Sequence, residues 1–304
     1  MTSRRSVMKA LVVGASGDNG GHLTRQLVQQ GHWVRGLVRD PDRAITGLHE
    51  VVRGDVVTGH GLTEALTGID VAFYFVHALD AADRNIDRRD TTAARRFVEA
   101  ATAADLPRCI FLTTLAPPDG VDPPAYQRNR LAVEQILLDG IAGTTVVRAG
   151  MVAAPGSRGM LPYSRLVQRF PVIPLGPWRH NRVAVSDPDT VAAAMITAAT
   201  DENLAGRILD ALSCGEPTHA ELIHAIAQQL RRRRLLVPIP FRTPRLDAAL
   251  VSMVTGQRHS FSRYLLSVNE NDYTTDPERS APLSHLESRD LSSVLENALA
   301  EMRH

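Results

Sequence analysis

Three evenly spaced glycines follow the first apolar run of the sequence. Gly14, Gly17 and Gly20 stand where a predicted strand turns into a predicted helix. In that context the first glycine permits a tight turn, the second lets a diphosphate approach the backbone, and the third lets the helix pack closely on the strand. The free N–H groups at the start of the helix then face the phosphates. We therefore expect a dinucleotide to bind this segment, with further contacts from the intervening Ser16, Asp18 and Asn19.

The residues that follow the second predicted strand bear on the identity of the dinucleotide. An acidic side chain at this strand tip accepts hydrogen bonds from the ribose of NAD, whereas an arginine faces the 2′-phosphate of NADP. Arg39 occupies the tip, so we expect NADP(H), and Asp40 leaves NAD(H) as the alternative. Asp55 and Val56, past the third predicted strand, are expected to bracket the adenine, although an ordinary turn aspartate also explains Asp55.

The elements that must position these residues alternate between strands and helices through the first 150 residues. The apolar runs are rich in β-branched residues and lack in–out alternation, which is typical of strands covered on both faces. This order predicts an α/β fold with a doubly wound, parallel, Rossmann-type sheet. The predicted strands are Met8–Val13, Trp33–Val38, Glu50–Arg53, Val71–Phe75, Arg108–Thr113 and Thr144–Val147, and the predicted helices are Gly20–Gln30, Gly61–Leu66, Asp87–Ala104 and Tyr126–Leu138.

The pattern changes after the sixth predicted strand. Residues 151–180 are rich in glycine and proline, which predicts loops around one short helix near Ser164–Phe170. Later segments predict helices over 186–200, 218–230, 244–255 and 291–302 and strands over 207–212 and 235–239. We expect an NAD(P)-binding domain of residues 1–150 plus about 181–205, and a smaller C-terminal α+β substrate-binding domain of about 151–180 and 206–304.

Composition excludes several classes of protein. The chain has 304 residues and a formal net charge of +1, so it has no global field to attract nucleic acid. Its two cysteines, Cys109 and Cys214, form neither a disulfide framework nor a zinc motif, so no metal site is expected. No apolar stretch is long enough to span a membrane, and no signal peptide is recognisable. We therefore expect a cytoplasmic protein.

At this point the residues resemble a known superfamily. The glycine spacing, the segment from Val34 to Asp40 and the pair Gly54-Asp55 together resemble the atypical short-chain dehydrogenase/reductases. Three further segments narrow the resemblance to bacterial NAD(P)H-binding proteins grouped with NmrA and with an accessory subunit of respiratory complex I. These segments are Phe73–Ala78, Val183–Ala192 and Leu236–Leu246. The resemblance implies dinucleotide binding strongly and a particular reaction only weakly.

The resemblance also implies where an active site would lie. Catalytic members use a serine or threonine after the fifth strand, then a tyrosine four residues before a lysine on the next helix. This chain offers Thr114, Tyr126 and Arg130, with arginine in place of lysine. The only lysine is Lys9, in the first predicted strand. Arginine keeps the positive charge that favours a phenolate but cannot relay a proton. A helix-surface tyrosine beside a solvated arginine is the alternative interpretation.

Three further residues are candidates at the edge where the cofactor is expected. Val76 and His77 follow the fourth predicted strand, and His77 is the alternative proton donor, although a structural histidine explains it as well. Met151 follows the sixth predicted strand and should form a wall beside the nicotinamide.

The second part of the sequence carries the features that bear on partners. Its apolar segments around Tyr163, Trp178 and residues 246–254 favour a small hydrophobic substrate, or else form only the core of a small domain. The run Arg231–Arg234 ends a predicted helix; a solvated helix end explains it best, with nucleic acid or anionic lipid as alternatives. We expect no nucleic-acid partner and no membrane span. A homo-oligomer is compatible with the sequence.

The leading hypothesis from these observations is an NADPH-dependent reductase that transfers hydride to a hydrophobic carbonyl, quinone or enone. The first alternative is a regulatory or structural protein that binds NADP(H) without turnover. The second alternative is an epimerase or isomerase with a bound dinucleotide.

Overall fold

A computed structural model describes residues 7–43, 45–77, 86–241, 243–256 and 259–302. These residues form two compact units, each assembled from separate parts of the chain. The first unit comprises Met1–Thr113, Asn129–Arg148 and Ala192–Leu209, and the second comprises Thr114–Arg128, Ala149–Val191 and Asp210–His304.

A parallel sheet of seven strands organises the first unit. Its spatial order is β10-β6-β5-β4-β1-β2-β3, in which the crossover from β3 to β4 returns the chain to the other side of β1. β1 pairs in parallel with β2 and β4, and the parallel pairing continues to β3 and β5. The strands are β1 (Lys9–Val13), β2 (Trp33–Val38), β3 (Glu50–Arg53), β4 (Val71–Tyr74), β5 (Arg108–Thr114), β6 (Thr144–Ala149) and β10 (Ile208–Asp210). The predicted doubly wound α/β fold is confirmed.

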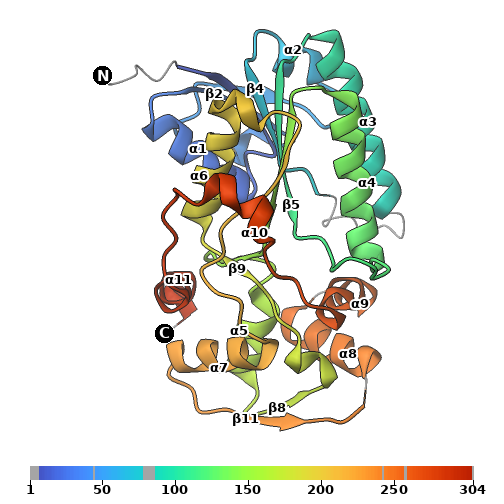
Figure 1. The fold of residues 1–304 in the computed structure, drawn as a ribbon, viewed down its shortest axis with the longest axis vertical. Coiled ribbons are helices and arrows are strands. Elements are labelled where there is room, and N and C mark those ends of the chain that lie inside the picture. The colour runs from blue at the N-terminus through green and yellow to red at the C-terminus, as the bar shows by residue number, and fades with distance from the viewer. Residues whose placement is uncertain (1–6, 44, 78–85, 242, 257–258, 303–304) are drawn as a thin grey trace. The chain divides into compact units, whose positions relative to one another are not determined.

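Helices cover both faces of this sheet, as Figure 1 shows, with α1 and α6 on one face and α3 and α4 on the other. They are α1 (Asp18–Gln29), α2 (Leu62–Leu66), α3 (Ile86–Ala103), α4 (Ala125–Gly140) and α6 (Pro188–Thr200). Under α3 and α4, the ring of Tyr74 lies 5.0 Å from that of Phe97 and 5.9 Å from that of Phe111. Such aromatic pairs stabilise a core beyond the apolar area they bury. Cys109 is fully buried in the same core, and burial raises the pKa of its thiol to about 12.

A buried ion pair fastens α4 to the sheet. Arg148 of β6 donates to both carboxylate oxygens of Glu134 of α4, from Nε at 3.1 Å and from Nη2 at 2.7 Å. Both side chains are less than a tenth exposed. A two-pronged contact of this kind fixes orientation as well as distance, so it sets the position of α4 along β6.

The second unit consists of short elements around its own apolar core. Its strands are β7 (Met151–Val152), β8 (Val172–Leu175), β9 (Val185–Ser186) and β11 (Leu235–Pro238). Its helices are α5 (Leu161–Arg169), α7 (His219–Gln229), α8 (Pro244–Thr255), α9 (His259–Leu266), α10 (Pro277–Ser280) and α11 (Leu291–Ala298). β8 pairs with β11 and β7 with β9, both in parallel.

Three features of the second unit differ from the sequence prediction. The short helix expected near residue 164 begins at Leu161, because Pro162 sits in its first turn, where a proline costs no hydrogen bond. The helix α9 was not predicted, and β7 and β8 lie in the stretch predicted as loops around that helix. By contrast, α7 begins as predicted, because Thr218 and Glu221 form a reciprocal capping box.

We expect the substitution Glu134→Gln to destabilise the protein by about 3–5 kcal/mol, because it leaves the buried guanidinium of Arg148 without its counter-charge. Glu50→Gln is the matched control, since the Arg35–Glu50 pair is partly exposed, and it should cost less than about 1 kcal/mol. Urea unfolding measures both effects. Equal losses for the two variants would contradict the role given to the buried pair.

Candidate dinucleotide and active site

The glycine loop of the first unit turns sharply at its first residue. Gly14 has a φ of +94°, a backbone conformation that side chains disfavour. Its carbonyl accepts a hydrogen bond from the N–H of Gly17 at 3.0 Å, and its own N–H donates to Leu37 of β2 at 3.3 Å. The loop is therefore held by its own backbone and by the neighbouring strand.

The other two glycines serve different purposes. A Cβ at Gly20 would lie 2.4 Å from the carbonyl oxygen of Gly14, so only glycine lets α1 start this close to the end of β1. A Cβ at Gly17 would meet only that same oxygen, at an ordinary 3.4 Å. The space around Gly17 is otherwise open, which is where a phosphate group would approach.

The start of α1 is suited to bind an anion. Gly17 caps the helix without a side chain, and no described residue accepts a hydrogen bond from the N–H groups of Asp18 and Asn19. Ser16, Gly17 and Asp18 are exposed. Free N–H groups and the positive end of the helix dipole together stabilise phosphate, so these residues fit the diphosphate of a dinucleotide.

The cofactor candidates after β2 and β3 lie in turns. Arg39 is exposed just after β2, and the Asp40 carboxylate accepts a hydrogen bond from the backbone of Asp42 at 3.2 Å. The Asp55 carboxylate similarly accepts one from the backbone of Val57 at 2.8 Å. Val56 is buried in the core of this unit. Asp40 and Asp55 thus both stabilise local turns.

Arg130 lies inside the first unit, at the carboxyl ends of β4 and β5. It is 4% exposed, and its guanidinium donates to Thr113 Oγ1 at 3.2 Å and to the carbonyl of Leu112 at 3.1 Å. A longer contact of 3.5 Å reaches the carbonyl of Val76. The same guanidinium lies 4.9 Å from the centre of the Phe111 ring, a favourable cation–π geometry. Arg130 therefore joins α4 to the ends of two strands.

A histidine and a buried carboxylate meet beside this arginine. Nδ1 of His77 lies 3.3 Å from Oδ2 of Asp90, and the same oxygen accepts a hydrogen bond from Asn129 at 2.8 Å. The Asp90 side chain is 1% exposed. Burial, together with the Asp90 carboxylate, raises the pKa of Tyr74 above its usual range. A carboxylate thus lies beside the imidazole ring, and such a pair is found among general acids and bases.

The catalytic candidates Thr114 and Tyr126 and the cofactor candidate Met151 belong to the second unit. Thr114 donates a hydrogen bond to the side-chain oxygen of Gln127 at 2.8 Å, and Gln127 in turn donates to the carbonyl of Leu115 at 3.1 Å. Tyr126 is half-buried in the first turn of α4. Met151 is half-buried in β7, and its backbone N–H donates to Ala184. The threonine that contacts Arg130 is thus Thr113, and Thr114 contacts Gln127.

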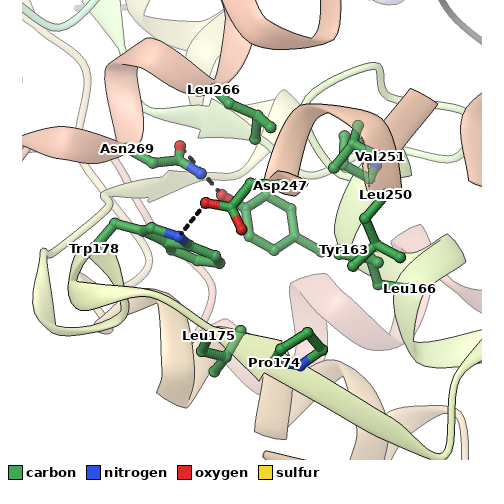
Figure 2. Close-up of a pocket in the computed structure, with 11 residues that line it drawn as sticks. Tyr163, Leu166, Pro174, Leu175, Trp178, Asp247, Leu250, Val251, Leu266 and Asn269 are labelled. Carbon is green, nitrogen blue, oxygen red and sulfur yellow. Dashed lines mark hydrogen bonds between the residues drawn. The ribbon is translucent and has the colours of Figure 1, made fainter. Parts of the chain in front are cut away.

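A small pocket lies within the second unit (Figure 2). Its cavity volume of about 20 Å³ is close to that of one water molecule. Trp178 Nε1 donates to the Asp247 carboxylate at 3.1 Å, and burial raises the pKa of Asp247. The lining is otherwise mainly apolar: Pro162, Tyr163, Leu166, Pro174, Leu175, Leu250, Val251, Leu266 and Asn269.

A buried histidine supports one wall of this pocket. The Tyr163 hydroxyl lies 2.9 Å from Nδ1 of His219, and the two rings are stacked. Burial lowers the pKa of His219 to about 4, so its ring is neutral at neutral pH. The pocket is therefore mainly apolar, with hydrogen-bonded polar groups at Tyr163, Trp178 and Asp247.

Sequence reasoning missed Asp90, Asn129, Gln127 and His219. Asp90 had a detectable signal, because it lies on the buried stripe of α3 that continues through Ala93, Ala94, Phe97 and Ala101. A carboxylate on an apolar stripe is rarely left without a partner.

Comparison with known proteins agrees with this geometry. Residues 14–151 match the family model described as NAD(P)H-binding. A ceramide reductase of Caulobacter vibrioides is 30% identical over 195 residues, which cover 61% of this chain and 59% of that protein. This chain therefore matches less than two thirds of the length of that relative.

Solved structures share the fold across nearly the whole chain. A nucleoside-diphosphate-sugar epimerase of Staphylococcus aureus has a TM-score of 0.76 at 17% identity and covers 95% of this chain and 100% of its own. A short-chain dehydrogenase/reductase superfamily protein of Agrobacterium tumefaciens, with bound NAD, has a TM-score of 0.70 at 16% identity, covering 97% of each chain. Residues 14–151 are thus similar to NAD(P)H-binding domains, and the solved structures share the fold of this chain.

Two kinds of feature are absent from the described residues. No helix among them is long and apolar enough to cross a membrane. Within the same residues, no group of histidine, cysteine and carboxylate side chains is arranged to hold a metal ion.

The two glycines of the loop give a sharp test of the phosphate site. Gly17→Ala should leave the melting temperature unchanged, because its φ of −83° suits alanine, yet weaken dinucleotide binding at least tenfold, because the methyl group occupies the phosphate approach. Gly20→Ala should instead destabilise the fold by about 1–3 kcal/mol, because its methyl group meets backbone. Calorimetric titration and thermal unfolding measure the two effects. Undiminished binding by a folded Gly17→Ala variant would contradict the assignment.

Proposed function

We propose that this protein is an NADPH-dependent reductase of a hydrophobic carbonyl, quinone or enone. The observation that carries the proposal is that the phosphate-binding loop and two candidate polar side chains lie at one edge of the first unit's sheet. The glycine loop follows β1, His77 follows β4, and the guanidinium of Arg130 lies on the ends of β4 and β5. Ligands of parallel α/β sheets bind beyond the carboxyl ends of the strands, which is this edge.

The choice of NADP(H) rests on Arg39 and Asp40. Arg39 is exposed at the tip of β2, where a guanidinium can contact a 2′-phosphate. The Asp40 carboxylate follows Arg39 and stabilises a local turn by accepting a hydrogen bond from the backbone of Asp42. Asp55, Val76 and Met151 complete the proposed contacts with the cofactor.

Tyr126 is the proposed acid. When bound, the cofactor supplies a hydride to the substrate, and the substrate oxygen then needs a proton. Tyr126 lies one helical turn before Arg130 on α4, so both side chains project from the same face. Because its donors are engaged by Thr113, Leu112 and Val76, Arg130 acts as a positioning residue in this proposal, and Thr114 orients the substrate oxygen.

His77 is the competing acid. Its Nδ1 atom lies 3.3 Å from the buried Asp90 carboxylate, which places a carboxylate beside the imidazole ring. A reductase that used His77 would need Asp90 for orientation and would not need Tyr126.

The proposed substrate is hydrophobic. The similar ceramide reductase of Caulobacter vibrioides acts, by its name, on a lipid. That name supports a substrate with a large apolar part. The pocket of the second unit is close in volume to one water molecule, so the proposed substrate class rests on this relative.

Binding of NADP(H) without turnover is the second candidate function. It is favoured by Arg130, whose Nε, Nη1 and Nη2 atoms already contact acceptors of the protein. Its guanidinium thus has few N–H donors left to contact the ribose of the cofactor, which is what the lysine of catalytic members of the superfamily does. A protein of this kind would bind the cofactor tightly and consume none of it.

The competing acids are separated by parallel substitutions. Tyr126→Phe should reduce NADPH consumption with a panel of ketones, quinones and enones by about 100-fold or more, since it removes the proton that is transferred. His77→Gln should change the rate by much less, and exposed His60→Gln is the control. The loss of NADPH absorbance measures each rate. If Tyr126→Phe consumes NADPH at the full rate and His77→Gln consumes it slowly, His77 is the acid and Tyr126 is not. Saturable NADPH binding without turnover in the unmodified protein would favour the second function.

A further inference from the structure

Several large apolar side chains of the second unit are exposed. Most surface residues of this kind are scattered singly in proteins, whereas a cluster marks an interaction surface. Leu235, Phe241 and Met253 are each more than 60% exposed. The large exposed apolar residues of this unit, among those described, are Val172, Leu235, Val237, Phe241, Leu246 and Met253.

The pairing of β8 with β11 places several of these side chains on one surface. Leu235 lies opposite Val172 in the parallel register, and Val237 lies opposite Pro174. Side chains two residues apart on a strand point the same way, so these four share one face of the two-stranded sheet. Ile173 and Leu175 occupy the opposite face and are fully buried. Figure 1 shows β8 and β11 side by side, with α7 leading into β11.

Helix α8 extends the same surface. Leu246 and Met253 are seven residues apart, about two turns, and therefore project from one side of the helix. Arg169, at the end of α5, donates a hydrogen bond to the carbonyl of Met253 at 3.3 Å. Arg169 is also only three residues before Val172, so this contact brings α8 close to the start of β8.

A dense positive charge adjoins these apolar residues. The segment 231–246 contains six arginines and no acidic residue, in a chain whose net charge is only +1. Arg231, Arg232 and Arg233 are exposed, and their guanidinium groups have no ion-pair partner among the described residues. The backbone fixes this run: Arg231 adopts the left-handed conformation at the end of α7, and Arg232 N–H donates to Ala227. Arg234 donates to the carbonyl of Val167, which ties the run to α5.

We propose that this surface docks the protein onto an anionic membrane. We call it the arginine–apolar face: Val172, Arg231–Arg233, Leu235, Val237, Phe241, Leu246 and Met253. Arginines that lack acidic partners are complementary to lipid phosphates, and the neighbouring apolar side chains can enter the acyl boundary. A nucleic acid would satisfy the arginines but leave the apolar side chains in water. The proposal does not depend on the reductase reaction, although a membrane is where a hydrophobic substrate would be concentrated.

Vesicle flotation with the full chain tests the proposal. The protein should bind vesicles of phosphatidylcholine mixed with phosphatidylglycerol, and bind pure phosphatidylcholine vesicles at least tenfold more weakly. The double substitution Arg232→Glu/Arg233→Glu should reduce binding to the mixed vesicles at least tenfold. Its matched control is Arg25→Glu/Arg95→Glu, which makes the same change of charge at exposed arginines of the first unit and should bind normally.

A second pair of variants tests the apolar part of the face. Phe241→Ser/Leu246→Ser should also weaken vesicle binding, while Val51→Ser, at an exposed valine of the first unit, should not. Circular dichroism verifies that each variant folds. The proposal is overturned if the unmodified protein fails to float with anionic vesicles at low salt, or if the control double variant loses as much binding as the test variant. It is also overturned if duplex DNA is bound more tightly than the vesicles and the serine variants bind vesicles normally.

Discussion

The close approach of two backbones organises the nucleotide-binding edge of this protein. The carbonyl of Gly14 lies where a Cβ of Gly20 would stand, so α1 begins directly against the end of β1. That approach points the open N-terminus of α1 along the strand ends, with Gly17 as a cap that carries no side chain. The anion site is therefore made by backbone geometry and the helix dipole, and only secondarily by charged side chains.

The neighbouring strand ends are fixed by polar side chains rather than by backbone. Arg130 crosses from α4 to the carbonyls of β4 and β5, and Asp90 holds both His77 and Asn129. A buried guanidinium and a buried carboxylate are stable only when their hydrogen bonds are satisfied, so each one restricts the elements it joins. The chemistry proposed for Tyr126 or His77 depends on this restriction.

The parallel sheet and the glycine loop were predictable because both follow from short-range pattern. The spacing of Gly14, Gly17 and Gly20 predicts a phosphate-binding turn, and the apolar runs predict strands covered on both faces. The partner of Arg130 was not predictable in the same way. Thr113 and Thr114 are adjacent and point to opposite faces of β5, and only the packing of α4 decides that Arg130 meets Thr113 while Gln127 meets Thr114. Asp90 and Asn129 are 39 residues apart, so no local pattern joins them.

The central claim is that the glycine loop and Arg39 together bind a phosphorylated dinucleotide. Isothermal titration of the full chain with NADPH and with NADH tests it most directly. The account predicts saturable binding of both, with NADPH bound at least tenfold more tightly because only NADPH carries the 2′-phosphate. Failure of either dinucleotide to saturate the protein would contradict the account as a whole, and tighter binding of NADH would contradict the part assigned to Arg39.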